Sequence, residues 1–237
     1  MDWQNGSALN TPRDHHSTFL VERPNANYLY VAGGTNYVDF YDTIERARIN
    51  ADGSLGAWEV AGKLPTPRGG TSIAVVGDYA VLTGGQISGT GGMKTLTRIA
   101  EVYTAPIAKD GTLGAWQAMS PLPEARFHHP AIANDGWIYV VGGQAEKEAS
   151  AGVFAARLTP DGKVESWQQM KPLPRPRSHH AAFVHDNHIY VVGGLDGPVG
   201  GMQAVFLDVI RSPIQADGSL GDWQIVSRIP HSYATHA

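Results

Sequence analysis

Residues 173–194 read LPRPRSHHAAFVHDNHIYVVGG, and this stretch decides the fold. An alternating apolar segment around 180–184 is followed by the run 189–192, which is almost continuously apolar. A run of that kind is typical of a strand covered on both faces. The paired glycines Gly193 and Gly194 close it. The stretch therefore predicts two neighbouring strands, the second of which lies in the middle of a sheet.

The same pattern occurs four times along the chain. The glycine pairs are Gly33-Gly34, Gly84-Gly85, Gly142-Gly143 and Gly193-Gly194, and the apolar runs before them are 28–32, 79–83, 138–141 and 189–192. Tryptophans recur at Trp3, Trp58, Trp116, Trp167 and Trp223, at intervals of 55, 58, 51 and 56 residues, whereas Trp137 lies outside this register. Intervals of this size are typical of a four-stranded propeller blade.

Two further features keep the same register. An arginine stands ahead of each alternating stretch, and Tyr233 takes its place in the last copy; the arginines are Arg13, Arg68, Arg126 and Arg177. An Asp-Gly dipeptide stands six residues before four of the tryptophans, at Asp52-Gly53, Asp110-Gly111, Asp161-Gly162 and Asp217-Gly218. Glycine tolerates the positive φ of a tight hairpin turn, so each dipeptide is predicted to join the third strand of a blade to its fourth.

The sequence thus predicts an all-β propeller with four complete four-stranded blades in one domain, residues 1–237. The repeats run approximately over 4–58, 59–116, 117–167 and 168–223, with a partial repeat at 224–237. A single blade cannot bury both of its faces and must stack on neighbours. The leading strand at Trp3 and the start of a fifth unit near Ala237 predict a partial blade at each end, as in a fragment of a six- or seven-bladed ring.

Composition restricts the function. Hydrophobic residues make up 42% of the 237 residues and charged ones 17%, so the chain is expected to fold. The net charge of −4 and the scattered basic residues argue against a nucleic-acid partner. We also expect no membrane span and see no secretion signal. The absence of cysteine excludes disulfides and thiolate metal sites from these residues.

The double glycine, the tryptophan at a fixed later position and the segment Pro174-Arg175-Pro176-Arg177 together resemble Kelch repeats. The motif DGSLGxW, seen at 52–58 and 217–223, is similar to bacterial Kelch proteins of the galactose oxidase and N-acetylneuraminate epimerase superfamily. The resemblance covers essentially the whole chain. It implies the propeller fold and slightly favours a periplasmic or extracellular location, while the compartment stays open.

The resemblance also points to candidate ligand contacts. Three histidine pairs share one repeat position, at His15-His16, His128-His129 and His179-His180. Neighbouring residues on a strand face opposite ways, so the two members need different explanations. In Kelch domains the first member projects toward the central pocket, which makes His15, His128 and His179 candidate ligand contacts, whereas the second is expected to be structural. Three imidazoles also suit zinc or copper, but the sequence does not fix their separation, and we predict no metal and no cofactor.

Residues just after the glycine pairs complete the candidate site. They form a largely neutral hydrogen-bonding set that suits sugar hydroxyls or peptide amides, namely Thr35, Asn36, Gln86, Gln144, Leu195 and Asp196. The recurring arginines are expected to bond between strands rather than to bind a carboxylate. The glycine-rich segments 89–92 and 197–201 are interpreted as long loops between the second and third strands.

No hydrolase signature is present, so the prediction is a non-enzymatic module that binds a protein or a glycan through loops at one end of the propeller channel. The alternative is a sugar-active enzyme resembling N-acetylneuraminate epimerase, with Arg, His and Gln side chains in acid-base and carboxylate-binding roles. A structural module without a discrete ligand is a third possibility. A copper radical oxidase is excluded, because its cysteine-tyrosine crosslink has no cysteine here. The sequence does not indicate the oligomeric state.

Overall fold

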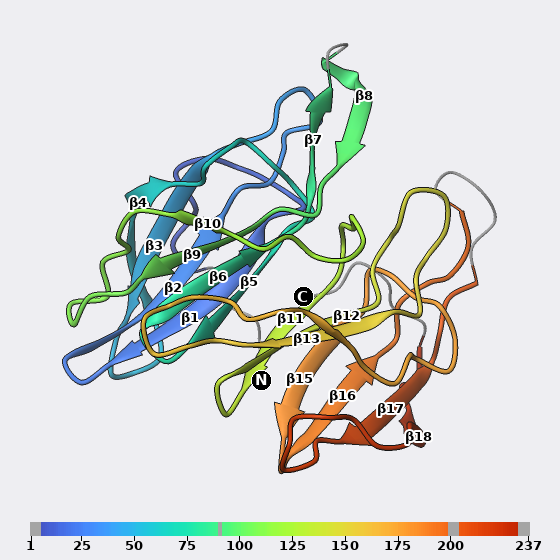
Figure 1. Cartoon of the computed structure of the whole chain (residues 1–237). Coiled ribbons are helices and arrows are strands. Elements are labelled where there is room, and N and C mark those ends of the chain that lie inside the picture. The colour runs from blue at the N-terminus through green and yellow to red at the C-terminus, as the bar shows by residue number, and fades with distance from the viewer. Residues whose placement is uncertain (1–5, 90–91, 199–203, 232–237) are drawn as a thin grey trace.

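The computed structural model describes residues 6–89, 92–198 and 204–231, and within these ranges the chain forms strands and no helix. Four antiparallel sheets of four strands follow one another along the chain (Figure 1). Blade 1 contains β1 (Ser17–Arg23), β2 (Ala26–Ala32), β3 (Thr43–Ile49) and β4 (Leu55–Lys63). Blade 2 contains β5 (Ser72–Val76), β6 (Tyr79–Thr83), β9 (Val102–Pro106) and β10 (Gln117–Met119).

The last two sheets repeat the arrangement. Blade 3 contains β11 (Ala131–Asn134), β12 (Trp137–Val141), β13 (Val153–Arg157) and β14 (Gln168–Gln169). Blade 4 contains β15 (Ala181–His185), β16 (His188–Val192), β17 (Asp208–Pro213) and β18 (Gln224–Arg228). In each sheet the strands pair with their neighbours in chain order. The all-β prediction and the four-stranded blades are confirmed, while the exact repeat boundaries stay predictions.

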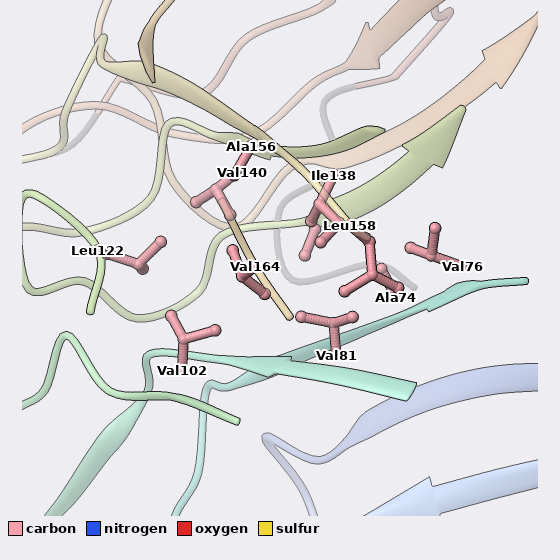
Figure 2. Packing of buried hydrophobic residues seen from close by; sticks show 11 residues of the cluster. Ala74, Val76, Val81, Val102, Leu122, Ile138, Val140, Ala156, Leu158 and Val164 are labelled. Atoms are coloured by element: carbon pink, nitrogen blue, oxygen red, sulfur yellow. The ribbon is translucent and has the colours of Figure 1, made fainter. Parts of the chain in front are cut away.

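The apolar core lies between neighbouring blades, which explains why the second strand of each blade is apolar on both faces. In β12, Ile138 and Val140 face blade 2, where they pack in a cluster with Val81 and Val102 (Figure 2). The alternate residues Tyr139 and Val141 pack in a different cluster, with blade 4. A third cluster joins blades 1 and 2. Stacking therefore buries both faces of an inner blade.

The predicted Asp-Gly turns join the third and fourth strands, and each has its glycine at positive φ, between +81° and +84°. Three of these turns also pack on the preceding blade. A Cβ atom on Gly162 would lie 2.2 Å from Tyr79, and one on Gly218 would lie 2.2 Å from Trp137. The hydroxyl of Tyr139 donates to the carbonyl of Gly218 at 2.9 Å. Trp137, the tryptophan outside the repeat register, is thus the surface against which the next blade's turn rests.

The recurring tryptophans hold the segments that connect blades. The indole Nε1 of Trp167 donates to the carbonyl of Ser120 at 3.2 Å, and that of Trp223 donates to Lys171 at 3.2 Å. Both acceptors lie just after the fourth strand of the preceding blade. Trp58 makes the equivalent bond to Ser7, so the contact recurs in blades 1, 3 and 4 and fixes the tryptophan spacing there.

The two glycine-rich segments, 89–92 and 197–201, differ in how far the structure describes them. The glycine-rich segment 89–92, predicted as a long loop between the second and third strands, lies at the tip of a hairpin: β7 (Gln86–Gly89) pairs with β8 (Gly92–Arg98), and the hairpin projects from blade 2 (Figure 1). Residues 199–201 of the second glycine-rich segment, 197–201, lie outside the described residues. So do Trp3 and residues 232–237 of the partial repeat predicted at 224–237.

None of the described residues belongs to a helix that is long and apolar enough to cross a membrane.

Candidate functional site

The first histidine of each pair lies in a bend just before the innermost strand of its blade. His15, His128 and His179 have φ of +50°, +51° and +55°, and Gly70 occupies the same position in blade 2 with φ of +60°. The first histidines therefore do not lie on strands, and the prediction that the paired histidines alternate along a strand is wrong. The left-handed backbone, not a strand's pleat, sends the two side chains into different surroundings.

Backbone hydrogen bonds link these four positions from blade to blade. The amide of Gly70 donates to the carbonyl of His15 at 2.8 Å, and the amide of His128 donates to Gly70 at 2.7 Å. The amide of His179 then donates to His128 at 3.1 Å. Corresponding bends on consecutive blades are thus joined directly, so the position of each imidazole is fixed by the stacking of the blades.

The three imidazoles lie together, and we call them the histidine cluster. The ring centroids of His15 and His128 are 4.6 Å apart, and those of His128 and His179 are 3.9 Å apart in a stacked arrangement. One nitrogen from each ring lies within 4.8 Å of the other two. Burial, reinforced by the neighbouring imidazoles, holds the pKa of His128 well below its usual value and lowers the pKa of His179 to about 4. These two rings are therefore uncharged at neutral pH.

The second histidines are buried in the blades. His129 accepts or donates a 3.0 Å hydrogen bond with the Thr83 hydroxyl of the preceding blade. Burial and the positive charge of Arg126 lower the pKa of His129 to about 3, and His180 shows the same shift beside Arg177. Both are neutral packing residues rather than ligand contacts.

The recurring arginines are fully buried at the same end of the blades. Each side chain is 0% exposed and donates to the carbonyl of the first glycine of a pair, as Arg126 does to Gly142 at 2.6 Å. Each also pairs with a carboxylate, for example Arg13 with Glu45 at 2.6 Å. Because these guanidinium groups already have hydrogen-bond and ion-pair partners inside the blades, we assign them a structural role rather than ligand binding.

The glycine pairs are needed where they stand, as Gly142 and Gly143 show. Their φ values are +56° and +99°. A Cβ atom at Gly142 would lie 2.7 Å from the carbonyl oxygen of Arg177, and one at Gly143 would lie 2.6 Å from the Cβ atom of His129. Closely packed backbone therefore joins one blade to the next beside the histidine cluster.

The candidates after the glycine pairs differ in what they do. Gln144 is fully buried, and its Oε1 accepts a 3.3 Å hydrogen bond from the Ser178 hydroxyl, which in turn lies 2.9 Å from Nδ1 of His179. Asn36 accepts from the backbone amides of two following residues. Asp196 accepts from the amide of Ala204 at 3.1 Å.

Gln86 belongs to β7, and its backbone pairs with Gly69. The flanking candidates Thr35 and Leu195 are buried and also pair with the chain before the first strand of their blades. The structure thus brings the three histidines together, with Gln144 linked to them through Ser178. Asn36, Gln86 and Asp196 each lie in the connection of their own blade.

Sequence reasoning missed the apolar side chains on these connections. The segments between the second and third strands, which we call the b–c connections, are 33–42, 84–101, 142–152 and 193–207. Among their described residues are five exposed large apolar side chains: Tyr37, Val38, Leu96, Val205 and Leu207 are 72%, 68%, 44%, 42% and 38% exposed. Because these connections follow equivalent strands, they emerge at one end of the propeller, the end of the histidine cluster. A signal was present in the sequence, since apolar residues in predicted loops are unusual.

One contact joins the connections to the cluster. The ring of Tyr37 meets that of His15 edge to face at a centroid distance of 6.1 Å. Burial raises the pKa of Asp14, but hydrogen bonds from Tyr37 and His15 outweigh this effect and lower it. The exposed tyrosine of blade 1 is therefore part of the same surface as the histidines. We call this surface, the b–c connections with the histidine cluster, the binding face.

Comparisons with known proteins agree with this architecture. A family model described as the KLHDC2/KLHL20/DRC7 Kelch-repeats domain matches residues 3–194. Beta-scruin of Limulus polyphemus is 29% identical over 147 residues, which cover 61% of this chain and 15% of the relative. Kelch-like protein 15 of Mus musculus is 26% identical over 210 residues, covering 81% of this chain and 32% of the relative.

Kelch-like protein 40 of Mus musculus is 25% identical over 188 residues, which cover 78% of this chain and 28% of the relative. The chain thus spans about a third or less of the length of these relatives. All three are animal proteins, and the comparisons do not show the bacterial type or the galactose oxidase-like superfamily that the residue pattern suggested. The repeated sheets, the buried arginines and the family match together establish that this chain belongs to the Kelch-repeat family.

Proposed function

We propose that the chain is a non-enzymatic binding module that takes a protein segment on its binding face. The observation that carries the proposal is the set of five exposed apolar side chains on the b–c connections. Exposed apolar groups gathered at one end of a rigid scaffold are typical of interaction surfaces. Aromatic side chains such as Tyr37 are enriched in such surfaces.

The repeated and the varied parts of the blades support the same proposal. The arginines, glycine pairs and second histidines perform the same structural task in each blade where they occur. Their polar groups and their space are therefore already used inside the fold and are not free to contact a ligand. The b–c connections differ in sequence and shape, from a short bend in blade 1 to the β7–β8 hairpin in blade 2. This division between repeated structural positions and variable connections supports recognition by the connections.

A glycan remains the second candidate ligand, because His15, Asn36, Gln86 and Asp196 offer neutral or acidic hydrogen-bonding groups at the same end. The epimerase-like alternative has less support. It needs groups that bind a carboxylate, and the four recurring arginines are buried and already paired.

The test is a selection from a displayed library of natural peptide segments, run beside a glycan array that includes sialic acids. A protein-binding module enriches a peptide class whose capture is lost in the double variant Tyr37→Ser and Leu96→Ser. The matched control is Leu20→Ser with Val60→Ser, because these side chains are 44% and 67% exposed but lie on β1 and β4. Binding to glycans alone, or equal loss in both double variants, would contradict the proposal.

A further inference from the structure

We propose that His15, His128 and His179 form a binding site for one divalent late transition-metal ion, with Zn²⁺ as the reference ion. The sequence predicts that these residues lie on three different blades but does not give the distances between their side chains, which the structure does. One nitrogen of each imidazole lies within 4.8 Å of the other two. The proposal concerns a site inside the fold and stands apart from the peptide-binding function.

The distances are close to those of a metal site. Zinc binds imidazole nitrogen at about 2.0–2.1 Å in a tetrahedral arrangement, so two ligand nitrogens lie roughly 3.3 Å apart. The separations in the cluster, all within 4.8 Å, exceed this by at most about 1.5 Å. Rotation of the stacked rings about their side-chain torsions closes such a gap without moving the backbone, which the blade-to-blade hydrogen bonds hold in place.

In His15 and His179 the polar neighbours lie at Nδ1, so Nε2 is available to coordinate a metal. Nδ1 of His15 lies 2.9 Å from a carboxylate oxygen of Asp14, which only accepts hydrogen bonds, so the proton belongs on Nδ1. The Ser178 hydroxyl lies 3.3 Å from Oε1 of Gln144 and 2.9 Å from Nδ1 of His179. In the tautomer with the proton on Nδ1, His179 donates to Ser178 and Ser178 donates to Gln144. Both rings then present a lone pair on Nε2. A carboxylate or hydroxyl partner on the other ring nitrogen is typical of histidines that bind metals.

The donor set selects the class of ion. Three imidazole ligands without a carboxylate ligand suit zinc, copper or nickel rather than magnesium or calcium, which prefer oxygen. Three protein ligands also leave the fourth tetrahedral position for water or for a group from a bound partner.

The best competing site within the described residues is on the surface, and it provides the control. His185 and His188 lie directly opposite each other in the β15–β16 hairpin. The side chain of His185 is 67% exposed, and this ring also lies 3.3 Å from the Asp186 carboxylate. A cross-strand histidine pair binds zinc weakly and adventitiously, so it must be separated from the cluster by mutation.

The experiment measures Zn²⁺ binding to the 237-residue chain by competition with a chromophoric chelator, and the melting temperature with zinc or with EDTA. The variants His128→Asn and His179→Asn remove one imidazole each, and asparagine tolerates the left-handed backbone better than most residues. The control is His185→Gln with His188→Gln. Circular dichroism of each metal-free variant verifies that the blades are folded.

The proposal predicts one zinc ion per chain with a micromolar or tighter dissociation constant. Zinc at about 100 times that constant raises the melting temperature by roughly 5–10 °C. Each Asn variant weakens binding by about 100-fold or more, while the control keeps it. Co²⁺ gives the absorption of a tetrahedral complex in the wild type and in the control, but not in the Asn variants. Millimolar binding, or binding lost in the control and kept in His128→Asn, would overturn the proposal.

Discussion

Two alanine substitutions at equivalent turns separate the two reasons for a glycine there. Gly53 and Gly162 both follow an aspartate in a turn between the third and fourth strands, with φ of +83° and +81°. Alanine in this left-handed region loses about 1–2 kcal/mol at either position. A Cβ atom at Gly53 meets nothing within 4 Å, whereas one at Gly162 would lie 2.2 Å from the Tyr79 ring of the preceding blade. Forcing a methyl group into packed surroundings costs about 1–3 kcal/mol more.

Gly53→Ala is therefore expected to lower the free energy of unfolding by about 1–2 kcal/mol, and Gly162→Ala by roughly 2–5 kcal/mol. Urea unfolding followed by tryptophan fluorescence measures both, and an unchanged m-value verifies that the comparison concerns stability. Equal losses in the two variants would refute the reasoning, because they would mean that the turn of blade 3 does not rest on blade 2.

Two further predictions concern buried polar groups. Arg13→Ala is expected to lower the free energy of unfolding by about 3–5 kcal/mol, and Arg68→Ala by less. Without Arg13 the Glu45 side chain, which is 1% exposed, is left buried and unpaired, whereas Glu101, the partner of Arg68, is 44% exposed. Equal losses in urea unfolding would contradict this. Burial raises the pKa of Tyr139 to about 12, above its unfolded value of about 10, so its contribution is complete below pH 10 and is lost as pH rises through 12. The stability difference between wild type and Tyr139→Phe should thus shrink by about 1.4 kcal/mol per pH unit between pH 10 and 12, and a constant difference would be evidence against it.

The blades were predictable because each repeat carries its own local signals. A glycine pair, an Asp-Gly turn and a tryptophan each reflect a constraint that recurs in every blade, such as the close approach of Arg177 to Gly142. Repetition at a fixed spacing makes weak local preferences additive. The same repetition correctly marked the arginines as structural.

The candidate site was less predictable, because it depends on distances between blades. The sequence pointed to His15, His128 and His179, but their stacking follows from the angle between blades and from the left-handed bends. Gln144 was expected beside solvent with the other polar residues, and the structure buries it under Ser178. A repeat position identifies which residues are equivalent, but it does not say which of them a neighbour covers.

The most direct test of the account is to map a captured peptide on the surface by comparing dissociation constants. For the peptide class with the highest enrichment, the binding-face variant Tyr37→Ser is expected to weaken binding by about 30-fold, the effect of losing a contact worth about 2 kcal/mol. Ile225→Ser, at a side chain 64% exposed on β18, should leave the constant unchanged. The reverse result, with binding lost in Ile225→Ser and kept in Tyr37→Ser, would contradict the claim that this Kelch-repeat chain binds its partner at the end of the b–c connections.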